Sequence, residues 1–374
     1  MTKTSPIKLP QRLDSIQALR GIAALLVLFF HLAAFQRQMA EDNPTDIALT
    51  TGLWDNGWAG VDLFFVISGF IMVYVTRQSG RSFSDVRRFL TSRITRIYPL
   101  WWVCAGIMAL YFFITYGMPA APDRVSGPDE AFRFAVKSFL LIPQDVPPML
   151  GLGWTLIHEM FFYIVFAGLL FLPRGVLPLG LMIWAVITVI GAIFISPSSY
   201  ARNALETFAS PLSLEFIAGG LAGYLVTTGR FYAPKVLAVI GGILAVIGLA
   251  GFSVINIGPY TTNRVLVFLL PFVLLTYGWV GHEIKTSAKA PQWLVRLGDW
   301  SYSLYLTHYI VLVGLRRIYR SVAPEGLDVG AAGIWDNVIF AFLALALSIL
   351  TSAIFYNLVE RPSLRFFKSL RRSE

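Results

Sequence analysis

Charged residues are scarce in this chain of 374 residues: they make up 14% of it, whereas hydrophobic residues make up 56%. Soluble globular proteins carry roughly 25% charged residues, because polar side chains have to cover their water-facing surface. A chain with so little charge lacks the side chains for such a surface. The composition therefore excludes an ordinary soluble protein and indicates an integral membrane protein.

Cysteine is almost absent as well, since Cys104 is the one cysteine of the sequence and lies in an apolar stretch. A single cysteine cannot form an intrachain disulfide and gives no indication of the redox compartment. The four histidines and the acidic residues lack the spacing of metal ligands, so we expect no metal. No cleavable signal peptide is evident, because the first apolar stretch follows a polar one and lacks a small-residue cleavage site.

Long apolar stretches are what the sequence has instead. A membrane-spanning helix needs about 20 mostly apolar residues. The segments that meet this requirement are 16–35, 60–76, 97–116, 152–172, 176–195, 211–228, 236–255, 265–282, 300–316 and 334–358. The sequence thus predicts an all-α, polytopic transmembrane helical bundle of about ten spans. It forms one domain over 1–374, with a short N-terminal segment 1–15, a basic tail 360–374 and no appended soluble domain.

The distribution of charge predicts the orientation. The net charge is +9, but the basic residues lie between apolar stretches and are not gathered on a polar domain, so we expect no nucleic-acid partner. Segment 1–20, connection 77–96 and the tail from Glu360 carry an excess of Lys and Arg, whereas 36–59 and 118–150 carry an acidic excess. Basic connections stay in the cytoplasm. Both termini are therefore predicted to be cytoplasmic.

Arg20 and His31 are ionisable residues within the first apolar segment, where burial in lipid is costly and therefore indicates function. They lie eleven positions apart, which is about three helical turns and about 16 Å along the axis, so they face the same side. This pattern favours an anion-binding cation at the cytoplasmic edge and a proton acceptor in the outer half. The alternative is a snorkelling arginine and a histidine hydrogen-bonded to a neighbouring helix.

Arg93 and Arg96 lie three positions apart in a basic loop at the mouth of the third span, and can share one face. Guanidinium groups match phosphate oxygens, so the pair could bind a phosphorylated donor, although topology alone would also explain the charge. Glu159 lies one turn into the fourth span and needs a buried partner. Trp154 and Tyr163 beside it could form an aromatic belt or stack on a sugar.

Other polar residues of the spans have less specific interpretations. His158 also lies in the fourth span, but points about 100° away from its neighbour Glu159. For Ser68 the favoured role is close helix packing, and for His308 it is a structural hydrogen bond. Glu360 is interpreted as a cytoplasmic cap of the last helix.

Five of these stretches, in this order, resemble the acyltransferase-3 family of membrane acyltransferases. They are Leu19-Arg20-Gly21 through His31, Gly60-Val-Asp62-Leu-Phe-Phe-Val-Ile-Ser68-Gly69-Phe70, Arg93-Ile-Thr-Arg96-Ile-Tyr-Pro99, Trp154-Thr-Leu with Glu159 and Phe162-Tyr163, and Ser301-Tyr302-Ser-Leu-Tyr305-Leu-Thr-His308. The stretch at Trp154 and the length most resemble bacterial exopolysaccharide acetyltransferases of this family. The secreted hydrolase-like domain of some members is not seen here, which implies a one-component reaction or a periplasmic partner protein.

The resemblance implies an enzyme of the bacterial inner (cytoplasmic) membrane. It would transfer an acyl group, acetyl first of all, from cytoplasmic acyl-CoA such as acetyl-CoA to a hydroxyl of an extracytoplasmic carbohydrate: exopolysaccharide, O-antigen or lipid-linked oligosaccharide. The catalytic residues it implies are His31, Arg20 and Glu159, the donor contacts Arg93 and Arg96, and the expected substrate contacts Asp62, Trp154, Tyr163 and His308. A neutral His31 would act as general base, or alternatively form a covalent acyl intermediate.

Two other classes of protein stay open at this point. A secondary transporter or flippase of a glycan precursor would also have many spans, but typically shows repeats or broken helices in matching halves, which the sequence lacks. A non-catalytic scaffold would tolerate replacement of Arg20 and His31. The expected partners are the lipid bilayer, the carbohydrate acceptor and a polysaccharide-synthesis complex.

Overall fold

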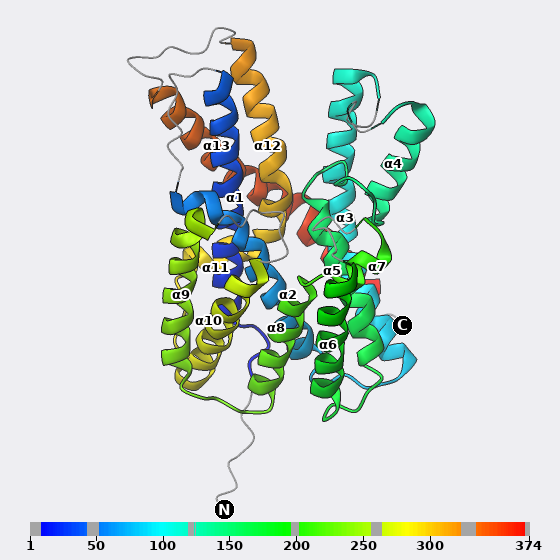
Figure 1. Cartoon of the computed structure of the whole chain (residues 1–374), viewed down its shortest axis with the longest axis vertical. Helices are drawn as coiled ribbons and strands as arrows, with labels where there is room; N and C mark the ends of the chain where they lie inside the picture. The colour runs from blue at the N-terminus through cyan, green and yellow to red at the C-terminus, as the bar shows by residue number, and fades with distance from the viewer. Residues whose placement is uncertain are drawn as a thin grey trace, which may run out of the picture.

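The computed structural model describes residues 9–42, 52–118, 123, 125–195, 202–255, 264–322 and 334–370. Within these ranges the regular structure is helical and no strand is present (Figure 1). The expectation of an all-α protein is thereby confirmed for the described residues. The longer helices are α1 (Asp14–Asp42), α2 (Gly60–Val75), α3 (Phe83–Tyr116), α5 (Gly153–Leu169), α6 (Leu177–Ile195), α8 (Ser213–Thr227), α9 (Pro234–Ile255), α10 (Val265–Thr286), α12 (Ser301–Val322) and α13 (Ile334–Phe355).

Shorter helical elements connect or extend these helices. They are η1 (Gly52–Ala59), α4 (Pro128–Leu140), α7 (Ala204–Ala209), α11 (Gln292–Asp299), the π-helical turn η4 (Tyr356–Glu360) and α14 (Arg361–Leu370). η4 joins α13 to α14. The helical structure therefore continues beyond the end of the last predicted span, 334–358.

Seven helical segments of the described chain are long and apolar enough to cross a membrane. They are Asp14–Gln38, Trp54–Val75, Phe83–Tyr116, Leu177–Ile195, Pro234–Gly251, Val265–Thr286 and Asn337–Leu370. α5 and α8 are apolar but shorter, and α12, with 22 residues, has the length of a span but a more polar sequence. Each of the ten predicted spans thus coincides with a helix. The protein is a multi-spanning membrane protein, whereas the count of ten and the orientation stay predictions.

α3 begins earlier than the sequence analysis predicts. Its first turn is closed by a capping box, in which the Ser82 hydroxyl accepts from the backbone N–H of Asp85 and the Asp85 carboxylate accepts from the backbone N–H of Ser82, both at 3.2 Å. The helix then continues through Pro99. Arg93 and Arg96 therefore lie on a helix, where the sequence analysis places a basic loop.

α1 and α2 occupy the centre of the bundle. Figure 1 shows α1 extending from the middle of the molecule towards its top, where it lies beside α12 and α13. α2 packs against α1, α5, α8 and α10. The two helices that carry Arg20, His31 and Asp62 are thus surrounded by other helices.

Two glycines allow α2 and α8 to pack closely. A Cβ atom at Gly69 would lie 1.8 Å from the backbone oxygen of Phe216, and one at Gly219 would lie 2.0 Å from that of Val66. Any larger residue would therefore force the two backbones apart. Small residues have this role at many helix contacts in membranes. The packing role predicted for this stretch of α2 thus belongs to Gly69.

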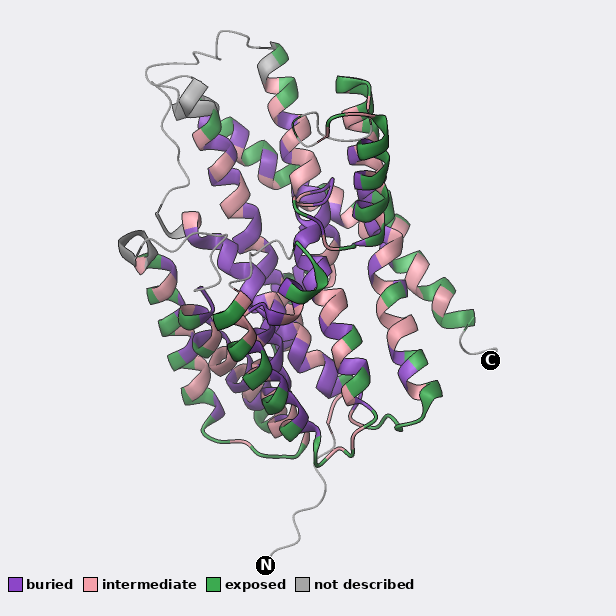
Figure 2. Cartoon of the chain, turned by 45° about the vertical axis from the view of Figure 1, so that its right-hand side comes forward, coloured by how far each residue is buried: buried purple, intermediate pink, exposed green. Residues whose placement is uncertain are grey.

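The outer surface of the bundle is apolar. Figure 2 shows buried residues concentrated where helices meet, and exposed ones on the outside of the bundle. Many exposed side chains are large and hydrophobic, among them Phe194 and Leu266, each 83% exposed, and Phe342, 69% exposed. Contiguous apolar surface of this extent is unfavourable in water. It is what a lipid-facing surface requires.

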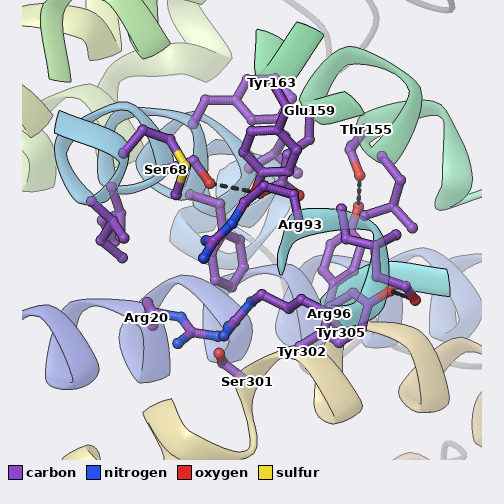
Figure 3. A pocket seen from close by; sticks show the side chains of 18 of the residues that line it. Arg20, Ser68, Arg93, Arg96, Thr155, Glu159, Tyr163, Ser301, Tyr302 and Tyr305 are labelled. Atoms are coloured by element: carbon purple, nitrogen blue, oxygen red, sulfur yellow. Dashed lines mark hydrogen bonds between the residues drawn. The ribbon is translucent and has the colours of Figure 1, made fainter. Parts of the chain in front are cut away.

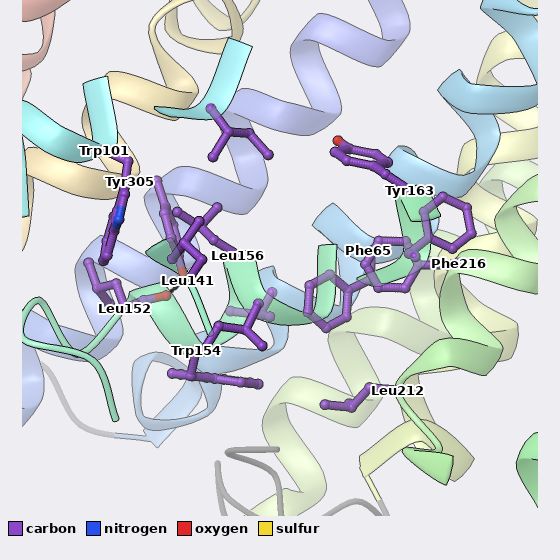
Figure 4. Packing of buried hydrophobic residues seen from close by; sticks show 14 of the residues in the cluster. Phe65, Trp101, Leu141, Leu152, Trp154, Leu156, Tyr163, Leu212, Phe216 and Tyr305 are labelled. Atoms are coloured by element: carbon purple, nitrogen blue, oxygen red, sulfur yellow. Dashed lines mark hydrogen bonds between the residues drawn. The ribbon is translucent and has the colours of Figure 1, made fainter. Parts of the chain in front are cut away.

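A cluster of aromatic residues fills the contact between α2, α5 and α8 (Figure 4). Phe216 stacks on Phe65 and on Phe162, with ring centroids 4.4 Å apart in each pair. Stacked aromatic pairs contribute about 0.5–1.5 kcal/mol each beyond their burial. Phe65 also lines the internal cavity described below, so this cluster forms a rigid wall behind it.

Candidate active site

A cavity of about 240 Å³ lies inside the bundle, between α1, α2, α3, α5 and the start of α12 (Figure 3). Its polar lining consists of Gln17, Arg20, Ser68, Arg93, Arg96, Thr155, Glu159, Tyr163, Ser301, Tyr302 and Tyr305. Aliphatic and aromatic side chains and Met72 form the rest. The sequence analysis expects five of the polar residues, Arg20, Arg93, Arg96, Glu159 and Tyr163, in the site. The structure brings these five together.

Arg20 from α1 and Arg93 and Arg96 from α3 extend into this cavity (Figure 3). Arg20 donates to Gln17 Oε1 at 3.2 Å, and the Arg93 guanidinium lies 5.8 Å from the ring centroid of Phe89. Within the described chain none of the three forms an ion pair closer than 4 Å. Arg20 and Arg96 lie close enough to repel each other. Concentrated positive charge in an enclosed space is suited to binding an anion.

Glu159 is held by two hydroxyl groups on the other side of the cavity (Figure 3). Ser68 Oγ donates to Glu159 Oε1 at 2.7 Å, and the Tyr163 hydroxyl donates to the same oxygen. The predicted packing role of Ser68 is therefore incomplete, because its side chain belongs to the site. The sequence gives no local signal for this contact, since 91 positions separate the two residues.

Glu360 is a further acidic residue close to the cavity, and the sequence analysis misses it. Glu360 is the last residue of the π-helical turn η4, and it is only 3% exposed. Ser303 Oγ donates to Glu360 Oε2 at 2.6 Å, and the carboxylate interacts electrostatically with Arg96 and Arg20. The sequence analysis interprets Glu360 as a cap at the end of the last helix, but the chain continues from it into α14 and the carboxylate is buried. Single π-helical turns occur frequently at functional sites.

The hydroxyl groups of α12 close another part of the cavity. Tyr302 OH donates to the backbone oxygen of Ile97 at 2.8 Å, and the hydroxyls of Tyr305 and Thr155 lie 2.8 Å apart. These contacts attach α12 to α3 and α5 and fix the two tyrosine rings. Their motif was part of the family resemblance, but no separate role was predicted for either tyrosine.

His31 and His308 form a pair that does not line this cavity. His308 Nε2 lies 3.3 Å from His31 Nδ1, and the ring centroids are 5.1 Å apart. The rings of His308 and Tyr305 lie 6.2 Å apart. The histidine pair therefore lies next to a residue of the cavity wall. The structure therefore does not place His31 in the same cavity as Arg20, and their common site stays a prediction.

Asp62 and Trp154 belong to a separate buried cluster. Arg264 Nε donates to Asp62 Oδ1 at 2.9 Å, with both side chains no more than 1% exposed. The Arg264 guanidinium lies 5.0 Å from the ring centroid of Trp58 and 5.6 Å from that of Trp154. Glu215 is buried next to this ion pair. The sequence analysis expects Asp62 and Trp154 to bind substrate, but neither of them lines the cavity.

His158 is also outside the cavity. It is buried against Trp154 and Phe65, with ring centroids at 5.8 and 6.3 Å. This agrees with the expectation that it points away from Glu159. Among the residues the structure describes, no three His, Cys, Asp or Glu side chains are grouped in a way that could hold a metal ion.

The fold and the cavity together define a class: a membrane protein of many helices with an internal cavity lined by three arginines. Residues 13–357 match the acyltransferase-3 family, whose profile is described as an acyltransferase domain. The chain therefore belongs to the acyltransferase-3 family and is an acyltransferase. This confirms the resemblance inferred from the five stretches. The family implies an acyl donor as substrate.

Individual relatives give the same class. The chain is 32% identical over 318 residues to the exopolysaccharide production protein ExoZ of Rhizobium meliloti, covering 83% of this chain and 90% of the relative. It is 26% identical to the acyltransferase MdmB of Streptomyces mycarofaciens, with coverage of 95% and 92%. It is 20% identical to the peptidoglycan O-acetyltransferase OatA of Listeria monocytogenes, over 93% of this chain and 55% of the relative. No solved structure matches significantly.

Proposed function

We propose that this protein transfers an acyl group, acetyl first of all, from cytoplasmic acyl-CoA to a hydroxyl of an extracytoplasmic carbohydrate in the bacterial inner membrane. One observation carries the proposal: Arg20, Arg93 and Arg96 meet at a cavity whose other walls combine apolar side chains with hydroxyl groups. Acyl-CoA combines phosphate groups with a long arm that ends in an uncharged thioester. The cavity offers a complementary surface to each part.

The size of the cavity limits how the donor would bind. Its volume of about 240 Å³ lies below the roughly 300 Å³ at which pockets for drug-sized ligands begin. It would therefore take the arm of acyl-CoA and not the whole molecule. The phosphates would lie against Arg20, Arg93 and Arg96, and the nucleotide part would stay at the cytoplasmic surface. The thioester would reach His31 past Tyr305.

The carbohydrate acceptor is supported by the relatives. Two of them are described as an exopolysaccharide production protein and a peptidoglycan O-acetyltransferase. Glycan polymers are presented outside the cytoplasm, and the predicted orientation places His31 in the outer half of the bilayer. The acceptor hydroxyl would therefore approach from that side. A complex with the polysaccharide-synthesis machinery would bring it there.

His31 would be the general base of the reaction. Its Nε2 would take the proton of the acceptor hydroxyl while the oxygen attacks the thioester carbon. The tetrahedral intermediate would then release CoA as a thiolate, which takes the proton from His31. The products are the ester and CoA, and the histidine returns to its neutral form. General base catalysis contributes about 10²- to 10⁴-fold to the rate.

Glu159 would act in this reaction through the donor site. Two hydroxyl groups hold its carboxylate, and the carboxylate interacts electrostatically with Arg93. It would keep the Arg93 guanidinium in place before the donor arrives. Its removal would then weaken donor binding more than it slows the chemical step.

The test compares wild type with His31→Ala in cells, by mass spectrometry of the surface glycan at equal protein level. We expect the acetyl mass increment in wild type and its loss in the variant. His282→Ala is the matched control, because His282 lies on α10 and does not line the cavity. If His31→Ala still acetylates the glycan, His31 is not the general base. Glycan movement without consumption of acetyl-CoA by the purified protein would favour a transporter instead.

A further inference from the structure

The contact between α1 and α12 places His31 and His308 side by side. The two helices lie against each other in the part of the molecule that Figure 1 shows above α2. His308 is fully buried, with 0% exposure, whereas His31 is half-buried. His31 is the more accessible member of the pair. A substrate could therefore reach His31 without reaching His308.

Both histidines have the same local hydrogen bond. Nδ1 of His31 lies 2.9 Å from the backbone oxygen of Val27, and Nδ1 of His308 lies 2.9 Å from that of Leu304. A carbonyl oxygen only accepts hydrogen bonds, so each Nδ1 has to be the donor. A neutral imidazole carries one N–H, and the other nitrogen has a lone pair. Each Nε2 is therefore the basic nitrogen of its ring.

These tautomers determine the direction of the hydrogen bond between the two rings. His308 Nε2 lies 3.3 Å from His31 Nδ1. The lone pair of His308 thus faces the N–H of His31, which is shared between His308 and the Val27 carbonyl. Two acceptors hold one donor, and this fixes both the orientation and the tautomer of the His31 ring. Nε2 of His31 has no hydrogen-bond partner in the described chain and is left for the acceptor hydroxyl.

We propose that His308 is a positioning residue: it accepts the hydrogen bond from His31 Nδ1–H and so holds His31 with a basic Nε2 towards the acceptor. This inference rests on the proposed role of His31. When Nε2 takes the proton, the His31 ring becomes positively charged. The lone pair of His308 and the carbonyl of Val27 then face this charge and stabilise it. Orienting partners of this kind are what make a histidine an effective base.

The surroundings of the pair leave this role to His308. The other rings closest to His31 are Phe30 and Tyr309, with centroids at 5.0 and 5.6 Å. No Asp or Glu side chain of the described chain makes a hydrogen bond or ion pair with His31. The usual carboxylate partner of a catalytic histidine is thus replaced by a second imidazole. His308 itself is oriented by the backbone of its own helix.

The experiment measures kcat and KM for acetyl-CoA on the purified full-length protein. His308→Phe keeps a buried ring and removes the lone pair. We expect kcat to fall about 10- to 100-fold, with KM within about twofold of wild type. His308→Gln should recover most of the lost kcat, because its amide oxygen can occupy the place of Nε2. Wild-type kcat in His308→Phe would overturn the inference.

A second pair of variants covers the case in which His308→Phe does not fold. Gln can place an acceptor where Nε2 of histidine lies, whereas the shorter Asn places it near Nδ1. An active His308→Gln beside a slow His308→Asn supports the positioning role. Equal rates for the two variants overturn it, as does an increased KM for the glycan at unchanged kcat, which would mean that His308 contacts substrate.

The double variant separates this inference from the proposed function. If His31 and His308 act as one unit, His31→Ala with His308→Phe is no slower than His31→Ala alone. Full activity of His31→Ala would remove the general base itself, and with it the basis of the inference. An inactive His31→Ala beside a fully active His308→Phe would contradict the inference and leave the proposed function standing.

Discussion

Arg20 and Arg96 lie close together at the cavity although both are positively charged. Glu360 offsets part of this repulsion, because its buried carboxylate interacts with both guanidinium groups. Its own position is fixed by Ser303 and by the π-helical turn that carries it. An internal negative charge thus helps to keep the proposed donor site assembled in the absence of ligand. The donor phosphates would add further negative charge to the same place.

Glu360→Gln should therefore destabilise the protein in the absence of donor. The amide keeps the shape of the side chain but leaves the repulsion between Arg20 and Arg96 uncompensated. We expect a loss of about 1–3 kcal/mol, seen as a lower Tm in detergent, and a larger rise in Tm on addition of CoA than in wild type. Asp123→Asn, at an exposed acid, is the control. An unchanged Tm would show that Glu360 does not compensate the arginines.

Arg96→Ala should weaken donor binding. Losing one guanidinium from a site for phosphate groups removes charge-assisted hydrogen bonds worth about 1.5–3 kcal/mol. We expect KM for acetyl-CoA to rise about 10- to 100-fold, with a smaller change in kcat. Arg88→Ala is the matched control, since Arg88 is an exposed arginine on the same helix. Equal effects of the two substitutions would mean that general surface charge, and not the cavity, attracts the donor.

At the scale of helices, the contact between α2 and α8 supports the part of α2 from which Ser68 lines the cavity. Gly69→Ala should separate these helices, because the new Cβ would meet the backbone oxygen of Phe216, which cannot move by itself. Overpacking of this kind costs about 1–3 kcal/mol. Thermal unfolding in detergent, followed by size-exclusion chromatography, measures the loss. Gly168→Ala on α5 is the control, since a Cβ there has no neighbour within 4 Å and should leave Tm unchanged.

Helix positions follow largely from local sequence. The stretch 60–76 predicts α2 (Gly60–Val75) almost to the residue, because apolar length alone defines such a helix. The early start of α3 was missed although its signal, Ser82 followed by Asp85, is in the sequence. The connection 118–150 was expected to be polar and contains α4. The start of α3 and the helix α4 both contain many polar residues, and a search for apolar stretches does not detect such segments.

The candidate site divides in the same way. Arg93 and Arg96 could be predicted because they lie on one helix face, where spacing determines geometry. The contact of Ser68 with Glu159 and that of Ser303 with Glu360 join distant parts of the chain, 91 and 57 positions apart. Spacing carries no information about such pairs. Asp62 shows the opposite case, since a polar residue inside a span was expected at the substrate but is bound to Arg264.

At the scale of the whole molecule, the orientation of the bundle can be tested with a membrane-impermeant thiol reagent on intact cells. The start of α3 is predicted to be cytoplasmic, and the segment before α4 to be outside. We expect labelling of Ser126→Cys and protection of Ser84→Cys, since both positions are exposed on the protein. Wild type is the control, because its Cys104 is buried. The reverse pattern of labelling would invert the topology and contradict access of CoA from the cytoplasm.

The continuity of α1 has a consequence for the choice of donor. Arg20 and His31 belong to one uninterrupted helix, so the distance between the proposed phosphate site and the proposed base, about 16 Å along the axis, cannot adjust to the ligand. The helix works as a molecular ruler. A thioester on a shorter carrier would bind by its phosphates and still fall short of the base, whatever acyl group it carried. Discrimination among donors would then depend on the length of the arm more than on the identity of its cargo.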